Sequence, residues 1–221
     1  CTSLNGISLP QSLKTIGGSA FRGCTSLEKI QLPDTTRQVQ WNAFENCESL
    51  KNIKLGSGVK NISSQTFQGC SSLESIILPY QMETIEDNAF KNCTKLKKIT
   101  IPKATTSISD SAFSYPDKMT IYGVAGSYAE QYAKENDIAF VAQQIATEKV
   151  TLTETELTLG RNEKYQLTAG LNPMDSTDEV IWSSSDEKIA KVDKTGNIEA
   201  ISAGEAVITA KAGEKTAICK V

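Results

Sequence analysis

The fold is decided by Ile16-Gly17-Gly18-Ser19-Ala20-Phe21-Arg22-Gly23-Cys24 and by the stretch Leu27-Glu28-Lys29-Ile30-Gln31-Leu32-Pro33 that follows it, because this pattern returns every 23 residues. Six apolar columns keep this spacing through five copies of the repeat. They are Phe21, Phe44, Phe67, Phe90 and Phe113; Cys1, Cys24, Cys47, Cys70 and Cys93; Leu4, Leu27, Leu50, Leu73 and Leu96; Ile7, Ile30, Ile53, Ile76 and Ile99; Leu9, Leu32, Leu55, Leu78 and Ile101; and Ile16, Val39, Ile62, Ile85 and Ile108. A strict repeat of this length is the signature of a solenoid.

One repeat is too short to enclose a core, so neighbouring repeats must bury each other's apolar columns. The alternation from Ile30 to Leu32 predicts a short strand with Ile30 facing inward. Pro33 ends that strand because proline has no N–H for a ladder hydrogen bond. On the opposite side of the repeat, a tight or short helical turn is expected to point Phe21 and Cys24 inward.

These residues resemble the BspA-like leucine-rich repeats, whose pattern combines A-F, a following cysteine, leucine and isoleucine, and a final proline. The resemblance covers about residues 1–141. It implies a leucine-rich-repeat solenoid over residues 1–142, with a C-terminal cap at about 123–142. It also implies a secreted or surface protein of a bacterium or protist, since many members are described as adhesins.

The last copy departs from the pattern, as terminal repeats of a stack often do. Tyr115-Pro116 stands where Asn or Gly followed by Cys is expected. We expect a slip of one residue in the strand around Met119-Thr120-Ile121-Tyr122. The stretch Gly126–Lys134 predicts a short amphipathic helix with Ser127 at its N-cap, and Ile138-Ala139-Phe140 ends the predicted cap.

The 23-residue columns vanish near Gln143–Glu148, where a second domain is expected to begin. Seven short runs with turn signals between them predict a β-sandwich. The runs are Lys149-Val150-Thr151-Leu152, Glu156-Leu157-Thr158-Leu159-Gly160, Lys164-Tyr165-Gln166-Leu167-Thr168-Ala169, Val180-Ile181-Trp182-Ser183, Ala190-Lys191-Val192, Asn197-Ile198-Glu199-Ala200 and Ala206-Val207-Ile208-Thr209-Ala210.

This second domain, residues 147–221, is similar to the bacterial Ig-like domain of group 2. The resemblance rests on Leu171-Asn172-Pro173, Val180–Asp186, Ile189–Asp193, Gly196–Ala200 and Gly204–Ala210. It implies an extracellular spacer or adhesion module. Trp182 is the expected buried core residue between the two sheets.

The recurring cysteines allow two interpretations. Equivalent residues of neighbouring rungs lie about 4.8 Å apart, so a disulfide between rungs is compatible with that distance. The alternative is a ladder of buried thiols, which the sequence favours because free cysteine behaves as a small hydrophobic residue. A metal site would need tight clusters such as C-x2-C, which are missing. Cys219 is expected in the core of a terminal strand.

Composition excludes several classes of function. The net charge is −3, so a polybasic nucleic-acid surface is not expected. The chain has no histidine, which removes the usual nucleophilic triads and the commonest metal ligand. No apolar run approaches the roughly 20 residues that span a bilayer. Because Cys1 falls in the middle of a repeat, we expect the chain to be a segment of a longer protein, with further domains outside it.

The best candidate binding surface is the predicted concave face of the solenoid. The residues that flank the inward isoleucines should point outward there and make the face mildly basic. The predicted partner-binding residues are Lys29, Gln31, Asn52, Lys54, Ser75, Ile77, Lys98 and Thr100, with Gly6 and Ser8 at the first strand. A solvated sheet without a partner is the alternative.

Two further features remain open. Trp41 lies outside the apolar columns, either as an exposed contact residue or packed against the adjacent turn. The acidic residues Asp175, Asp178, Glu179, Asp186 and Glu187 form either a calcium site or, as the missing EF-hand spacing favours, a solvated acidic loop.

The sequence therefore predicts a secreted or cell-surface binding protein that recognises an extracellular protein or glycan through the solenoid. No catalytic residue, metal ligand or cofactor is predicted, and an enzyme is not expected. The alternatives are a structural spacer and an accessory module of a larger secreted enzyme.

Overall fold

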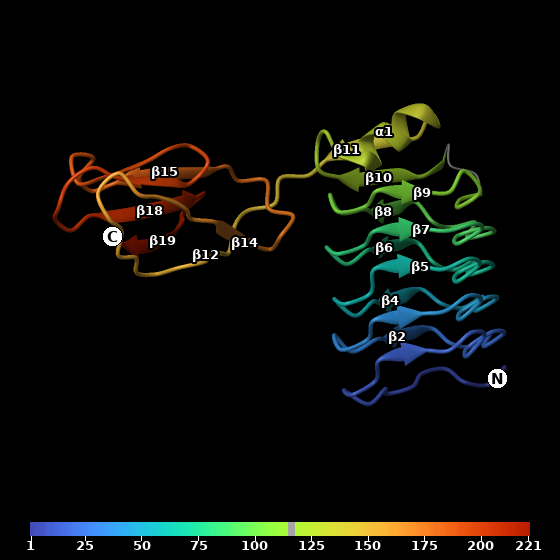
Figure 1. Cartoon of the computed structure of the whole chain (residues 1–221). Coiled ribbons are helices and arrows are strands. Elements are labelled where there is room, and N and C mark those ends of the chain that lie inside the picture. The colour runs from blue at the N-terminus through green and yellow to red at the C-terminus, as the bar shows by residue number, and fades with distance from the viewer. Residues whose placement is uncertain (115–117) are drawn as a thin grey trace. The chain divides into compact units, whose positions relative to one another are not determined.

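The computed structural model describes residues 1–114 and 118–221, and the chain divides into two compact units, Cys1–Gln143 and Gln144–Val221. The first unit is a solenoid of stacked coils, and the second consists of antiparallel sheets (Figure 1). The predicted fold class is therefore confirmed. No helix among the described residues is long and apolar enough to cross a membrane.

Two rows of short parallel strands build the solenoid, and both keep the 23-residue register, so that Ile30 faces Ile53 and Ile76 faces Ile99. The first row contains β2 (Lys29–Gln31), β4 (Asn52–Lys54), β6 (Ser75–Ile77), β8 (Lys98–Thr100), β10 (Thr120–Gly123) and β11 (Ala139–Ala142). The second row contains β1 (Thr15–Ile16), β3 (Gln38–Val39), β5 (Asn61–Ile62), β7 (Thr84–Ile85) and β9 (Ser107–Ile108). In Figure 1 the coils rise as an almost straight stack, so the face predicted to be concave is nearly flat.

Both rows are interrupted once. In the first row β2 pairs with β4, and a separate sheet of β6, β8, β10 and β11 follows. In the second row β1 pairs with β3, and β5, β7 and β9 form a separate sheet. No backbone hydrogen bond joins β4 to β6 in the described parts of the chain, although the coils remain joined at the phenylalanine turn, where Phe44 donates to Thr66.

The phenylalanine column forms a continuous stack of rings. The centroid distances between successive rings are 5.2 Å for Phe21–Phe44, 5.5 Å for Phe44–Phe67, and 5.4 Å for both Phe67–Phe90 and Phe90–Phe113, and the rings are nearly parallel. Phe44, Phe67 and Phe90 are almost fully buried. The predicted inward direction of these residues is confirmed.

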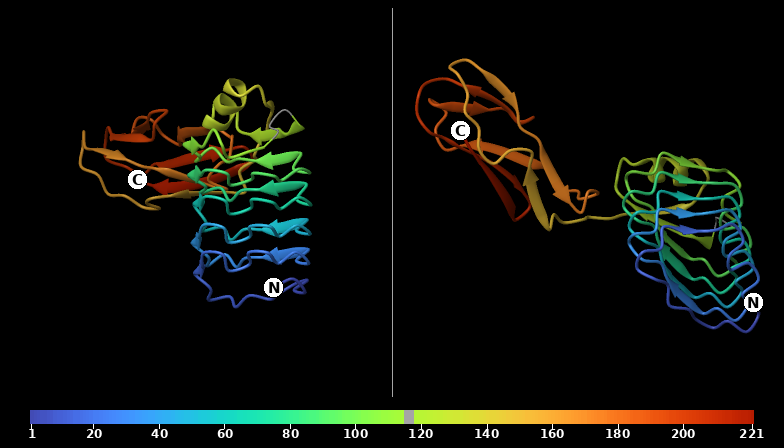
Figure 2. Two further views of the ribbon diagram at one scale, coloured as in Figure 1. Left: turned by 90° about the vertical axis from the view of Figure 1, so that its right-hand side faces the viewer. Right: turned by 60° about the horizontal axis from the view of Figure 1, so that its bottom comes forward.

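A short helix and one strand cover the end of the solenoid away from the N-terminus (Figure 2). The predicted slip is confirmed, because Ile121 of β10 faces Ile99, which is 22 residues earlier instead of 23. Helix α1 (Tyr128–Glu135) begins after Ser127 as predicted, but the Ser127 hydroxyl makes no capping hydrogen bond. Glu130 accepts from the Gly126 N–H at 2.6 Å instead. The predicted departure at Tyr115-Pro116 lies outside the described residues.

The second unit contains eight strands in three antiparallel sheets. β12 (Lys149–Leu152) pairs with β14 (Ala169–Asn172); β13 (Lys164–Gln166), β17 (Asn197–Ala200) and β16 (Ala190–Val192) form the next sheet; and β15 (Val180–Ser184), β18 (Val207–Ala212) and β19 (Lys215–Lys220) form the last. Trp182 is half-buried and packs against both apolar clusters of this unit.

Two strand predictions in this unit are wrong. The run 156–160 forms no strand, because only Glu156 bridges to Lys220 and the chain then leaves β19. The run 164–169 is not one strand but two, since β13 pairs with β17 whereas β14 pairs with β12. Leu167 lies at the point where the chain changes partners, and its side chain is fully buried.

Candidate functional site

The outward side chains of β2, β4, β6 and β8, here called the strand face, include eight of the predicted partner-binding residues, whereas Gly6 and Ser8 lie in a segment that forms no strand. Each strand buries its central isoleucine at least partly and turns the residues on both sides outward, as the period of two requires. Seven of the eight are exposed: Lys29, Gln31, Asn52, Lys54, Ser75, Ile77 and Lys98. Thr100 is only half-buried, next to the paired strand β10.

Two hollows lie on the strand face and gather six of these residues. The first, of about 540 Å3, lies over β2 and β4 and includes Lys29, Gln31 and Asn52. The second, of about 470 Å3, lies over β4 and β6, where the backbone ladder is interrupted. Its lining combines strand residues with the residues after the strands: Asp34, Asn52, Ile53, Lys54, Leu55, Ser57, Ser75, Ile76, Ile77, Leu78, Pro79 and Tyr80. Lys98 and Thr100 line neither hollow.

Tyr80 is a lining residue that sequence reasoning missed. Its column contains Gln11, Asp34, Ser57 and Lys103 in the other copies, so an aromatic ring stands where the repeat otherwise places polar or charged residues. This break in the column was the available signal. Together with Ile77, which is 71% exposed, Tyr80 gives the second hollow an apolar side.

The charged groups of the two hollows differ in whether they already have a partner within the protein. The Asp34 carboxylate accepts a hydrogen bond from the Ser57 backbone N–H at 3.1 Å, and this bond, with Lys54 nearby, lowers the pKa of Asp34. The Asp34 carboxylate is thus already bound to the loop that follows β4. Neither Lys29 nor Lys54 forms a salt bridge within the described residues. The strand face therefore offers ammonium groups to a partner.

Both interpretations of Trp41 hold in part. Its side chain is 58% exposed, and its ring also packs on the preceding coil, where a Cβ atom on Gly18 would lie 3.0 Å from Trp41 Cε2. The tryptophan is thus an exposed ring held in place by a turn.

The cysteine ladder consists of free thiols. Cys24, Cys47, Cys70 and Cys93 are buried, and no disulfide links them. Each of the last three thiols donates to the carbonyl of the phenylalanine 26 residues earlier, at 3.0–3.2 Å. The interpretation as a buried thiol ladder is confirmed. Burial raises the pKa of Cys47 and of Cys93 to about 12, so these groups stay protonated near neutral pH.

We expect a thiol reagent at pH 8 to label Cys1 rapidly in the native protein, because it is the exposed cysteine, and the other five only after unfolding.

The raised pKa values of the buried thiols have a second consequence, for the stability of the solenoid at high pH. The stabilisation from neutral Cys47 and Cys93 is complete below pH 9 and is lost as the pH rises towards 12. Ellman titration and urea unfolding at several pH values measure both effects. Rapid native labelling of five or six thiols would contradict the burial.

The acidic residues considered for calcium lie in separate turns. Asp178 accepts from the Thr147 N–H at 2.7 Å, and Asp186 accepts from the Lys188 N–H at 2.9 Å. Within the described ranges, no three acidic or cysteine side chains converge as a metal site would require.

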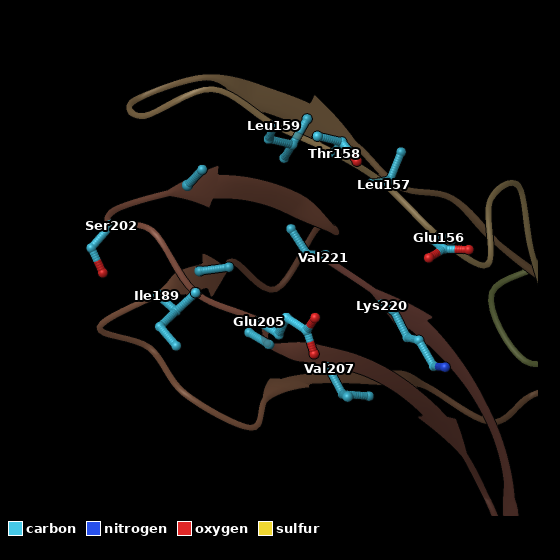
Figure 3. Close-up of a pocket in the computed structure, with 14 residues that line it drawn as sticks. Glu156, Leu157, Thr158, Leu159, Ile189, Ser202, Glu205, Val207, Lys220 and Val221 are labelled. Atoms are coloured by element: carbon cyan, nitrogen blue, oxygen red, sulfur yellow. The ribbon is translucent and has the colours of Figure 1, made fainter.

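A hollow of about 520 Å3 in the second unit is shown in Figure 3. Leu157 and Leu159 lie along one side of it, and Ile189 and Val207 lie across from them. Its charged lining residues, Glu156, Glu205 and Lys220, come from different segments. The hollow lies beside the segment 156–159, which forms only one bridge to β19, and we interpret it as the incompletely filled edge of the core.

Comparison with known families gives two matches. Residues 1–120 match the BspA type leucine rich repeat region in six copies. Residues 146–221 match the bacterial Ig-like domain, group 2.

A solved structure with a similar fold is that of a leucine rich cell surface protein from Faecalibacterium prausnitzii A2-165. It is 32% identical with a TM-score of 0.54, over 58% of this chain and 34% of that one. Among curated proteins, the polysaccharide lyase 8 family protein HylA of Enterococcus faecalis is 37% identical over 87 residues, and lacto-N-biosidase of Bifidobacterium bifidum is 44% identical over 54 residues. These matches cover 37% and 24% of this chain, but only 6% and 5% of those proteins.

Proposed function

Because the chain belongs to the family of BspA-type leucine-rich repeat proteins, we propose that it is a secreted or cell-surface binding and adhesion protein that holds an extracellular partner on its strand face. The similar chain from F. prausnitzii is a cell surface protein, which supports this location. The match to a bacterial Ig-like domain supports it as well, since such a domain suits a module that projects the solenoid outward.

The observation that carries the proposal is the exposed Ile77 at the interruption between β4 and β6. Ile77 is 71% exposed, so a partner that covers its side chain removes apolar surface from water and thereby stabilises the complex. The hollow beside it also contains Tyr80 and Pro79, so an apolar side chain of a partner would find apolar contacts there. Aromatic residues are enriched at protein interfaces for this reason.

The surrounding charges favour a protein partner with an acidic, extended segment. Lys29 of β2 faces Asn52 and Lys54 of β4 faces Gln31, so the two lysines lie on opposite sides of the central isoleucines. Lys98 faces Ser75 and stands in the same column as Lys29. Ammonium groups on one face attract carboxylates and accelerate association at low salt. The strand face of a solenoid is long and regular, which suits an extended chain.

Replacing Lys29, Lys54 and Lys98 together by alanine is expected to weaken binding to host extracellular-matrix proteins by at least about tenfold. Ile77→Ser should cause a comparable loss without changing the charge. Surface plasmon resonance with the immobilised full chain measures both variants, and the Lys29/Lys54/Lys98 effect should shrink at high salt.

A matched control removes three exposed lysines outside the strand face, Lys14, Lys91 and Lys103, and so makes the same change in net charge. The control variant should bind as the unchanged chain does. Equal binding by the Lys29/Lys54/Lys98 and Ile77→Ser variants and the parent would refute the strand face as the site.

A second function has support from the curated relatives. HylA and lacto-N-biosidase are much longer than this chain, and the matching part is a small fraction of each. We therefore keep the accessory module of a larger secreted enzyme as the alternative, with a spacer role for the second unit. We also propose that the two units themselves catalyse no reaction, which the absence of histidine supports. Assays of the full chain on polysaccharides would test this.

A further inference from the structure

The second strand row carries an exposed tryptophan that the proposed function does not use. Trp41 is the only aromatic residue among the large apolar side chains that are strongly exposed in the described ranges. The same position holds Gly18, Ser64, Asp87 and Asp110 in the other coils. The repeat therefore does not need a large ring here. Leaving an indole in water costs free energy that a ligand could recover.

The ring is fixed by the coil before it. A Cβ atom on Gly18 would lie 3.0 Å from Trp41 Cε2 and 3.3 Å from its Nε1, so the indole rests on bare backbone. The Trp41 carbonyl accepts from the Ser19 N–H at 3.1 Å, which holds the main chain of the tryptophan on the same coil. A ring held in this way loses little conformational entropy when a ligand stacks on it.

Three exposed amides in or directly after β3 and β5 use their side-chain oxygens to accept hydrogen bonds from neighbouring coils. Gln40 accepts from the Gly18 N–H at 2.9 Å, Asn61 accepts from the Thr84 hydroxyl at 3.0 Å, and Gln38 accepts from the Thr15 hydroxyl at 3.4 Å. Their NH2 groups form no hydrogen bond to any described residue. The surface thus presents three amide donors to an incoming ligand.

These amides line a small hollow of about 230 Å3, formed by Arg37, Gln38, Val39, Gln40, Asn61 and Ser63. The hollow lies at the interruption between β3 and β5, where the Ser63 hydroxyl donates to the Val39 carbonyl at 2.9 Å. Gln40 belongs to both parts of the site. It lines the hollow, and its side-chain oxygen accepts from the N–H of Gly18, the residue on which the indole packs. None of the six lining residues is acidic.

We propose that Trp41 and this hollow bind an oligosaccharide that contains N-acetylated hexose units. The apolar C–H face of a pyranose ring stacks on the indole, and the acetamido carbonyl and hydroxyl oxygens accept hydrogen bonds from Gln38, Gln40 and Asn61. A ligand of this class matches both halves of the site, since it combines an apolar face with many acceptors. An apolar side chain would cover the ring but offers no acceptor to the amide donors.

The test is calorimetric titration of the full chain with chitohexaose, an N-acetylglucosamine hexamer. Trp41→Ala is expected to weaken binding at least about tenfold, as loss of a central aromatic contact does elsewhere. Asn61→Ala should weaken it several-fold, and Trp41→Phe should retain part of the affinity. Because Trp41 is exposed, its replacement should leave thermal unfolding of the solenoid nearly unchanged.

Two comparisons make the result specific. Maltohexaose has the same length but no acetamido group, and it should bind at least about tenfold more weakly. Ile77→Ser changes the strand face and should leave chitohexaose binding intact, which separates this site from the proposed function. The inference is overturned by absence of chitohexaose binding, by equal binding of maltohexaose, by tighter Trp41-dependent binding of an oligouronate, or by full affinity in a folded Trp41→Ala variant.

Discussion

Replacing Phe67 by alanine is expected to lower the free energy of unfolding of the solenoid by about 3–5 kcal/mol. Phe67 is fully buried, and its ring stacks between Phe44 and Phe90 at centroid distances of 5.5 and 5.4 Å. The truncation leaves a cavity that the coils above and below cannot close, because backbone hydrogen bonds hold the spacing between them. The Phe67 N–H itself donates to the Ala89 carbonyl at 2.9 Å.

The matched control is Phe113→Ala at the end of the same stack. Phe113 is only half-buried and has Phe90 on one side and the tilted Tyr132 ring on the other. Its loss should cost clearly less than that of Phe67, because the end of the stack can relax. Urea unfolding followed by circular dichroism measures both. Equal losses for the two variants, or a loss below about 1 kcal/mol for Phe67, would mean that the stack does not hold the coils together.

The repeat made most of the solenoid predictable, because residues in one column share one environment. A single strand of two or three residues carries little information, but five copies of Ile30 and its equivalents define one inward face. The phenylalanine stack and the thiol ladder follow from the same reasoning. Their neighbours in space are the same residue type in the next copy.

One buried column escaped prediction because it mixes apolar residues with threonine. Leu13, Thr36, Val59, Met82 and Thr105 occupy equivalent positions, and the last four are almost fully buried. Threonine is tolerated there because its hydroxyl finds a partner in the preceding coil. Thr36 donates to the Leu13 carbonyl at 3.2 Å, and Thr105 donates to the Met82 carbonyl at 2.9 Å. A hydropathy pattern cannot show that a polar group will be satisfied in this way.

The interruptions of the two ladders were also beyond the sequence, and they matter most for the candidate sites. The columns continue unbroken through β4 and β6, so periodicity predicts a continuous sheet. Whether two coils form backbone hydrogen bonds depends on displacements much smaller than the spacing between residues. A column of equivalent residues carries no information about such displacements. Both the hollow beside Ile77 and the one beside Gln40 lie at these interruptions.

The second unit has no internal repeat, so the sequence contained less information about where its short strands begin and end. The runs at Val180–Ser183 and Asn197–Ala200 were placed correctly, because alternation and turn signals agree there. The run 156–160 has the same alternation, but alternation records only which side chains face the core. It does not show whether a backbone partner lies alongside. Leu157 still donates its N–H to the Lys220 carbonyl, but no strand pairing follows it within the run 156–160.

Gly196→Ala is expected to destabilise the second unit by at least about 3 kcal/mol, because two independent costs add. Gly196 has a φ of +90°, which residues with a Cβ rarely adopt. A Cβ atom there would also lie 2.3 Å from the Leu167 carbonyl oxygen and 2.9 Å from Trp182 Cζ2. The oxygen cannot move away easily, since the Leu167 N–H donates to the Gly196 carbonyl at 3.0 Å and ties the two segments together.

Gly160→Ala provides the control within the same unit. A Cβ atom on Gly160 would meet only Glu163 Oε2 at 3.4 Å, an ordinary contact with the end of a flexible side chain. This variant should change the free energy of unfolding by less than about 0.5 kcal/mol. Differential scanning calorimetry of the full chain checks both, because Gly196→Ala should shift the transition of the second unit and leave that of the solenoid unchanged. If Gly196→Ala melts as the parent does, then Trp182 and Leu167 are not packed against the 193–197 turn as tightly as these distances require.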